Sequence, residues 1–194
     1  MADTEQACLQ HWRKELLKDI QGDVLEIGSG TGANLDFYAK EEIQLTVSEP
    51  DKNMRKQLAS KVASFELDSI IVSDGSAEDI PSKDETFDYV VASLVCCSVK
   101  NLDAALLEIQ RVLKTGGSLI FMEHVAATEG TKRRRWQNFF NPLWRKLAGN
   151  CHLNRETEKA ILAAGFEIKV ITRESMRKTM PLVRPTIRGQ AIKV

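Results

Sequence analysis

The sequence predicts an α/β fold in which strands and helices alternate around a mostly parallel sheet with an antiparallel last strand. Three observations predict it. Residues 24–27 have the apolar character of a buried strand and run into a loop with three glycines. Strand-like and helix-like runs then alternate as far as the strand-like run 118–122. The final strand-like runs, 166–171 and 189–194, are too close for a helical crossover, so we expect an antiparallel pair.

The totals are those of an ordinary globular protein. A chain of 194 residues is most simply one domain, spanning 1–194, and is long enough to bury a core. Acidic and basic residues balance at 27 each, which argues against a nucleic-acid partner. No stretch has the apolar length of a membrane span or the pattern of a signal peptide. A cytoplasmic protein is therefore predicted.

The first helix is predicted over residues 5–19 from an apolar stripe that ends at Gly22. It either packs on the sheet or lies across the mouth of the site. After the glycine loop, residues 34–38 are expected to begin a helix whose free N–H groups face the loop.

The second strand, 45–48, ends in Glu49-Pro50, and Glu49 follows Gly28 by 21 positions. At this separation a carboxylate at a strand tip can reach a ribose diol. A helix over 52–63 should turn Met54, Leu58 and Val62 inward. Met54 is either a core residue or a thioether that covers an adenine ring.

The third strand, 69–72, leads into a polar loop, 73–81, where Ser76 and the Ala77 N–H group could read an adenine edge. A nearly continuous apolar run, 87–95, predicts a central strand with cysteines at its tip. The next helix should start at Asn101 and end at the glycines of 115–117. A fifth strand, 118–122, follows and is tipped by Glu123 and His124.

Residues 132–148 interrupt this alternation with four basic residues followed by an aromatic helix. Pro142 is expected to end or bend this helix. We interpret 132–153 as a lid-like insertion. The basic run is either a solvated helix start or a contact with a membrane surface or a nuclear import signal. A helix over 154–164, capped by Asn154, precedes the last two of seven predicted strands.

The glycine loop also fits G-x-G-x-x-A, so a nicotinamide dinucleotide must be considered. Three features favour S-adenosylmethionine instead. Glu26 precedes Gly28 by two residues, where an anion could act indirectly on the cofactor's amino group. We expect no second domain for a nicotinamide substrate, and the loop at 75–81 suits an adenine edge better than a pyrophosphate. The residues predicted to bind the cofactor are Glu26, Gly28, Ser29, Gly30, Glu49, Pro50, Met54, Gly75, Ser76, Ala77, Ser93 and Leu94.

Several segments carry a resemblance to known families. E-I-G-S-G-T-G, S-E-P-D-K-N-M, D-G-S-A-E-D-I-P and R-V-L-K-T-G-G-S-L-I resemble the motifs of class I methyltransferases of the ubiquinone/menaquinone type. S-L-V-C-C-S-V-K-N, F-M-E-H-V-A-A, G-N-C-H-L-N-R-E and L-V-R-P-T-I-R-G resemble the methyltransferase-like 7 family, the alkyl thiol S-methyltransferases. This resemblance implies a Rossmann-like, seven-stranded class I methyltransferase fold.

The resemblance also implies an enzyme that transfers a methyl group from S-adenosylmethionine to a small lipophilic thiol. Members of that family carry an N-terminal hydrophobic anchor to the endoplasmic reticulum or lipid droplets, and this sequence shows no such stretch. We therefore expect either a soluble relative or, if a native anchor is missing from this sequence, a protein at the endoplasmic reticulum or lipid droplets. Ser29 replaces a cysteine usual in the glycine loop, Glu49 replaces an aspartate and Cys96 replaces a leucine. None of these departures should abolish cofactor binding.

His124 is the best-placed titratable group for a catalytic role, because its ordinary pKa lies near working pH. A structural histidine beneath the lid is the alternative. The four cysteines show no metal-ligand spacing, so no metal is predicted. Cys97 is either a core residue or a thiol near the expected methyl position. Cys96, Cys97 and Cys151 suggest arsenite methylation as an alternative activity, because trivalent arsenic binds several thiolates. Small-molecule O- or C-methylation of the quinone type is another. A non-catalytic partner subunit that binds the cofactor is the non-enzymatic alternative.

Overall fold

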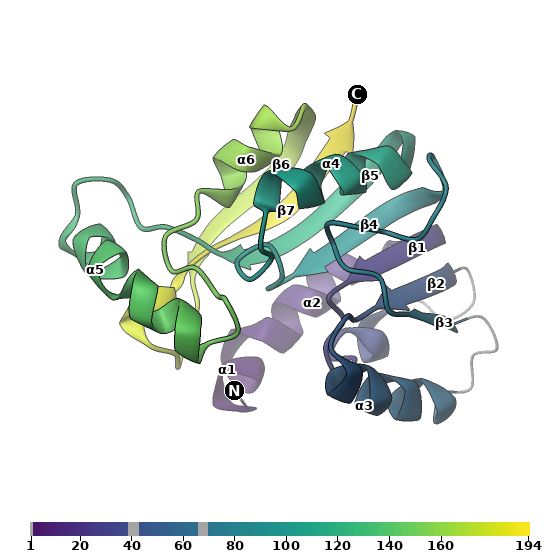
Figure 1. Cartoon of the computed structure of the whole chain (residues 1–194), viewed down its shortest axis with the longest axis horizontal. Coiled ribbons are helices and arrows are strands. Elements are labelled where there is room, and N and C mark those ends of the chain that lie inside the picture. Colours follow the sequence, from purple (N-terminus) through teal and green to yellow (C-terminus); the bar gives the residue numbers. More distant parts are fainter. Residues whose placement is uncertain (1, 39–42, 66–69) are drawn as a thin grey trace.

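A computed structural model describes residues 2–38, 43–65 and 70–194. Seven strands form one sheet in the order β3-β2-β1-β4-β5-β7-β6 (Figure 1). Their bounds are β1 Gly22–Ile27, β2 Ile43–Ser48, β3 Ile70–Ser73, β4 Phe87–Ser93, β5 Leu113–His124, β6 Phe166–Ser175 and β7 Pro185–Lys193. The first five are parallel, while β7 is antiparallel to β5 and β6. The predicted fold class and antiparallel last strands are confirmed.

Helices cover both faces of the sheet (Figure 1). On one face, α4 (Leu102–Val112) and α6 (Thr157–Ala163) bury Leu106, Ile109 and Ile161. On the other, the end of α2 (Gln10–Leu17) and α3 (Lys52–Ala63) bury Leu17 and Leu58. Each helix contributes an apolar stripe to a sheet whose central strands are apolar on both sides, which is why the core has two layers.

The N-terminal segment packs on the sheet, which is the first of its two predicted placements. It consists of α1 (Ala2–Thr4), a π-helical turn, η1 (Glu5–Leu9), and α2. Leu9 and Trp12 are buried against Met122 and Met176, with Leu94 packed alongside. The segment therefore packs against the carboxyl ends of β4 and β5. In the described part of the chain, no helix is long and apolar enough to cross a membrane.

Several predicted boundaries are wrong. Residues 35–37 form a short 3-10 turn, η2 (Leu35–Phe37), within the segment expected to begin a longer helix. The α4 helix ends at Val112, and residues 113–117 already belong to β5. Leu113 pairs with Phe87, and this pairing extends the strand through the glycines expected to cap the helix. Ser69, the predicted start of the third strand, lies outside the described residues.

Two further helix predictions need correction. The helix α5 (Lys132–Leu147) continues through Pro142, so of the two predicted effects of this proline, ending the helix is wrong. The α6 helix begins at Thr157, so Asn154 does not cap it, and its N-cap residue, Glu156, makes no side-chain cap bond. Asn154 instead donates its side-chain amide to Asn138 on α5. This bond uses the polar group that the sequence assigned to capping.

Candidate active site

The glycine loop presents bare backbone at the carboxyl end of β1. Gly28 and Gly30 have φ of +57° and +58°, a left-handed conformation that side chains disfavour. A Cβ on Gly28 would lie 2.6 Å from Val95, whereas a Cβ on Gly30 would meet nothing within 4 Å. Between them, the Ser29 hydroxyl donates to the Glu26 carbonyl. The loop is therefore packed against the tip of β4 at Gly28 and open at Gly30.

Glu49 lies at the tip of β2, directly beside this loop. Its Oε2 accepts from the Gly30 amide at 2.9 Å, and its Oε1 accepts from the Asp51 amide at 2.9 Å. Pro50 follows, and Asp51 caps α3 by accepting from Asn53 and Met54 amides. A carboxylate has about four lone-pair sites, so Glu49 keeps acceptor capacity for a diol.

The polar loop after β3 lies against the tip of β2. The Ser48 hydroxyl donates to the Gly75 carbonyl at 2.6 Å, and Ser76 pairs with Asp79 in an isolated bridge. Ala77 is buried in the core with Leu106. A Cβ on Gly75 would lie 2.3 Å from Pro81, so the turn requires glycine. Hydrogen bonds therefore bring this loop close to β2 and Glu49.

Glu26 points into the protein from β1. It accepts a 2.5 Å hydrogen bond from the Tyr38 hydroxyl and is 2% exposed. Burial raises the pKa of Glu26 from 4.5 to about 7, against hydrogen bonds from Tyr38 and Asn34 that lower it. Because the carboxyl group is buried and bonded to Tyr38, its indirect effect on a cofactor stays a prediction.

Three predicted cofactor residues remain, namely Ser93, Leu94 and Met54. Ser93 ends β4, and its hydroxyl is buried without a hydrogen-bond partner. Leu94 follows with φ +59°, which turns the chain away from the strand. Met54 is 47% exposed, so the prediction that it faces the core is wrong. Because it lies in the first turn of α3, beside Glu49, its placement is compatible with covering a ligand.

Glu123 holds the turn that follows β4. Its carboxylate accepts from the amides of Val95, Cys96 and Cys97 at 2.8, 2.9 and 3.3 Å. The side chain is fully buried, and burial raises the pKa of Glu123 to about 7 although these amides lower it. The bonds fix the tip of β4 to the tip of β5, where His124 lies.

The structure brings together two thiols and one imidazole, a set of donors that no sequence motif indicated. His124 Nε2 lies 2.9 Å from Cys151 Sγ, and donor atoms of Cys97, His124 and Cys151 lie within 4.8 Å of one another. We call these residues the thiol–imidazole cluster. Successive members are 27 residues apart in sequence, so no local spacing could have indicated them. His124 was predicted as a site residue, whereas the two cysteines were considered only as core residues or as thiols for the alternative activity, arsenite methylation.

The surroundings of the cluster shift the pKa values of its two thiols in opposite directions. A hydrogen bond from Cys97, opposed by burial and assisted by His124 and Trp144, lowers the pKa of Cys151 to about 4. The same hydrogen bond and burial raise the pKa of Cys97 well above its ordinary value. The protein therefore favours a thiolate at Cys151 beside a protonated Cys97.

A separate cavity of about 650 Å³ lies beyond the tip of β5. Its walls come from residues after β5, from α6 and from the ends of β6 and β7. Many lining residues are charged, and Arg173 pairs with Glu158 within it. This polar lining differs from the largely apolar walls of small-molecule sites, and we do not assign an apolar substrate to this cavity.

Comparisons with known proteins agree with this geometry. The methyltransferase domain family matches residues 25–121. Thiol S-methyltransferase TMT1A of Homo sapiens is 38% identical over 192 residues, covering 93% of this chain and 78% of the human protein. Thiol S-methyltransferase TMT1B of Rattus norvegicus is 37% identical over 187 residues, covering 91% and 75%. The chain belongs to the thiol S-methyltransferase family.

Membership in this family confirms the predicted resemblance and the prediction of a methyltransferase that uses S-adenosylmethionine. Solved structures show the same fold at low identity. The [4+2]-cyclase SpnF has a TM-score of 0.77 at 22% identity, covering 95% of this chain and 79% of that one. Geranyl diphosphate methyltransferase has a TM-score of 0.77 at 12% identity, covering 97% and 79%. Because the same fold occurs in a cyclase, the roles of this chain's residues must be argued from its site.

Proposed function

We propose that this enzyme transfers the methyl group of S-adenosylmethionine to the sulfur of a small lipophilic thiol. One observation carries the proposal. The similarity to thiol S-methyltransferase TMT1A extends over 93% of the chain, whereas the general methyltransferase domain match ends at residue 121. The second half, which supplies Cys151 and α5, is therefore also similar to a protein named for thiols.

The residues at the carboxyl ends of β1 and β2 fit the cofactor. Gly30 leaves open space over bare backbone, and Glu49 beside it has lone pairs left for the ribose hydroxyls. The buried Ser93 hydroxyl lacks a partner among the described residues, so a ligand group could satisfy it. In our proposal, Ser76 and Ala77 face the adenine edge while Met54 covers the ring.

S-adenosylmethionine supplies a methyl group already activated on a positively charged sulfur. The protein's main task is therefore to hold the acceptor sulfur in line and to favour its thiolate. A free thiol has a pKa of about 8.5, so only a few per cent is ionised near neutrality. We place the acceptor sulfur beside the thiol–imidazole cluster, which follows β4 and β5 at the edge of the sheet that carries the glycine loop.

The quinone-type alternative is less supported. Ubiquinone/menaquinone biosynthesis C-methyltransferase UbiE of Rickettsia peacockii is 28% identical over 153 residues and covers 72% of this chain. Both its identity and its extent fall below those of the thiol enzymes. A purely cofactor-binding role is also less supported, because the chain combines the cofactor residues with the cluster.

The test is product analysis with a panel of acceptors. The protein is incubated with S-adenosylmethionine and alkyl thiols, phenols, quinols or arsenite, and methylated products are identified by mass spectrometry. We expect S-methylated thiols and no other product. Cofactor binding without turnover on any acceptor would instead support the partner-subunit reading, and methylated quinols would support the alternative enzyme.

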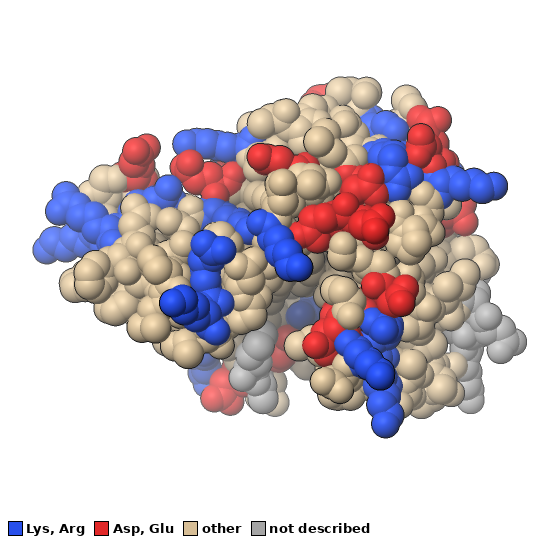
Figure 2. Space-filling model, viewed as in Figure 1, with Lys and Arg blue, Asp and Glu red and all other residues tan. Residues whose placement is uncertain are grey.

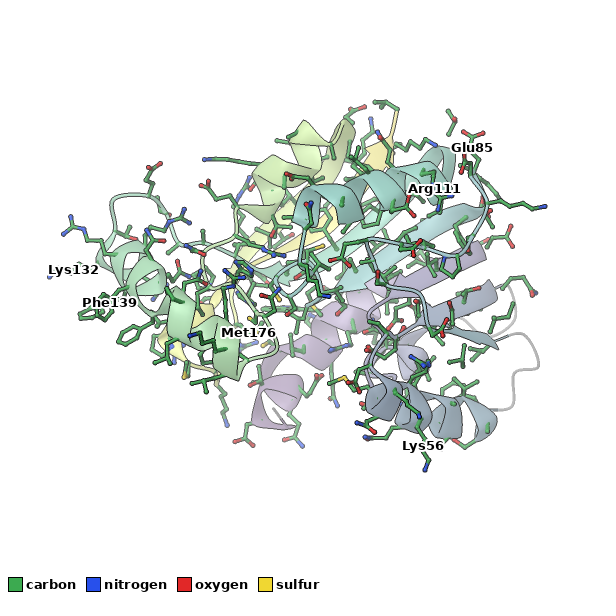
Figure 3. The ribbon with its side chains drawn as sticks, viewed as in Figure 1. Lys56, Glu85, Arg111, Lys132, Phe139 and Met176 are labelled. Atoms are coloured by element: carbon green, nitrogen blue, oxygen red, sulfur yellow. The ribbon has the colours of Figure 1, made fainter. Side chains whose placement is uncertain are left out.

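We also propose that α5 contacts a membrane surface, where lipophilic thiols concentrate. Trp136 and Phe140 stack at 5.6 Å, and Phe139, 72% exposed, meets both edge-on. Figure 3 shows Phe139 and Lys132 projecting outward from this helix. Basic side chains gather around α5 in Figure 2. An apolar face flanked by Lys and Arg is typical of helices that lie at an anionic interface.

A further inference from the structure

We propose that Cys97, His124 and Cys151 bind one Zn²⁺ ion and leave its fourth position for the thiol substrate. This inference deepens the proposed function and rests on it for the identity of the fourth ligand. Two sulfurs and one imidazole are the donors that zinc prefers, and a catalytic zinc site has three protein ligands and one open position. Nothing in the family comparison names a metal.

The distances allow the ion with small side-chain shifts. The three donor atoms lie within 4.8 Å of one another. Tetrahedral zinc, with Zn–S of about 2.3 Å and Zn–N of about 2.0–2.1 Å, separates two sulfurs by about 3.8 Å and sulfur from nitrogen by about 3.6 Å. The His124–Cys151 separation of 2.9 Å would therefore lengthen by roughly 0.7 Å. Cys151, which is half-buried and follows α5, is free to make this shift more readily than a residue in the sheet.

The backbone around the cluster is tied in place before any ligand arrives. The His152 amide donates to the Cys97 carbonyl at 2.7 Å, and the Asn150 side chain donates to the Ser98 carbonyl at 2.8 Å. The Arg155 guanidinium donates to the carbonyls of Cys96 and Val99. On the other side, Glu123 holds the Cys97 amide. Both cysteines are thus presented to His124 by fixed main chain, which is what a preorganised metal site requires.

The cluster also has the right position for the reaction. Cys97 lies two residues after Val95, whose side chain packs against Gly28 of the glycine loop. His124 ends β5, the strand beside β4. The metal would therefore lie close to the segment that packs against the cofactor loop. The described donor set contains no carboxylate, so the two cysteine thiolates would balance the charge of the ion and leave a neutral site.

The chemistry balances without an oxidant or reductant. The substrate thiol would lose its proton to solvent and occupy the fourth position as a thiolate. Its sulfur then forms a bond to the methyl carbon while the bond from that carbon to the cofactor's sulfur breaks. The products are a neutral thioether and S-adenosylhomocysteine. A neutral thioether is a weaker zinc ligand than a thiolate, so product release follows from methylation.

The experiment measures metal content and activity in parallel, on untagged full-length protein. Elemental analysis should find one zinc per chain, and cobalt substitution should give thiolate-to-cobalt charge-transfer absorption. Cys151→Ser, Cys97→Ser and His124→Ala should each lose the metal and the absorption. Cys8→Ser is the matched control, because Cys8 is a buried cysteine outside the cluster that packs against Leu9 and Trp12. Circular dichroism confirms folding, and half-buried Cys151 gives the variant least prone to misfold.

Activity separates this inference from the proposed function. If both hold, chelation should lower thiol methylation at pH 7 by about 30-fold, the factor lost when a thiol of pKa about 8.5 must ionise unaided. Added Zn²⁺ should restore it. Full activity in metal-free protein, or a Cys97–Cys151 disulfide in place of bound metal, would overturn the zinc site and leave thiol methylation standing. Stoichiometric zinc without methylation of any thiol would overturn the proposed function and leave the metal site standing.

Discussion

Glu49 Oε2 accepts a hydrogen bond from the Gly30 amide at 2.9 Å, which joins the tip of β2 to the glycine loop after β1. The same carboxylate accepts from Asp51, at the start of α3. One side chain therefore fixes three segments around the proposed ribose position. This arrangement makes Glu49 a residue whose charge and shape should both affect cofactor affinity.

Replacing Glu49 with Gln should weaken S-adenosylmethionine binding by about 10- to 100-fold, since charge-assisted hydrogen bonds contribute about 1.5–3 kcal/mol. The amide has only one acceptor oxygen and would direct N–H groups at backbone donors. Isothermal titration calorimetry measures the change. Asp36→Asn is the control, because Asp36 is an exposed acid paired with Lys61. Equal affinities for the two variants would contradict the role given to Glu49.

The variants Gly28→Ala and Gly30→Ala serve as controls for each other. Both positions have left-handed backbone, so an alanine at either should cost about 1–2 kcal/mol of unfolding free energy. Only the alanine at Gly28 meets Val95, so that variant should be less stable than the other by a further measurable amount in urea unfolding. Adding Val95→Ala should recover part of this difference. At Gly30 the new methyl group enters open space, so there we expect lost cofactor affinity with little extra instability.

Glu26 should make stability depend on pH. Its folded pKa is raised from 4.5 to about 7, so the folded state retains a proton that the unfolded state releases within this window. Stability from this group is therefore full below pH 4.5 and is lost as the pH rises toward 7 and beyond, by up to about 3 kcal/mol. Glu26→Gln cannot titrate, and its unfolding free energy should fall less between pH 5 and 8. Parallel stability profiles for the two proteins would show that Glu26 titrates normally.

The exposed aromatic face of α5 should bind anionic vesicles. Phe139→Ser should reduce co-sedimentation with phosphatidylserine vesicles severalfold, because it removes a side chain that is 72% exposed from the centre of the apolar face. Leu162→Ser on α6 is the matched control, since Leu162 is an exposed apolar residue (51% exposed) on another helix. Binding that is unchanged by Phe139→Ser, or equal on neutral vesicles, would argue that α5 has a different partner.

The sequence predicts the features that depend on local patterns. These are the alternation of strands and helices, the glycine loop and the placement of Glu49 beside it. Boundaries set by tertiary pairing were missed. The glycines at 116 and 117 read as a helix cap because glycine favours one, yet pairing with β4 extends β5 through them. Met54 has helical spacing that suggests the core, but Leu58 is the buried residue of α3, and Met54 in the first turn is 47% exposed. Cys151 joins Cys97 and His124 only through the folded chain, which no spacing rule could anticipate.

The position of β7 has a consequence for biosynthesis. Because β7 lies between β5 and β6, residues 166–175 have no neighbour in the sheet until translation has passed Lys193. The five parallel strands can pair as they leave the ribosome, whereas β6 waits as an unpaired edge that is open to chaperones or to misassembly. Removing residues 185–194 should therefore leave β6 without its neighbour in the sheet and lower the yield of folded enzyme.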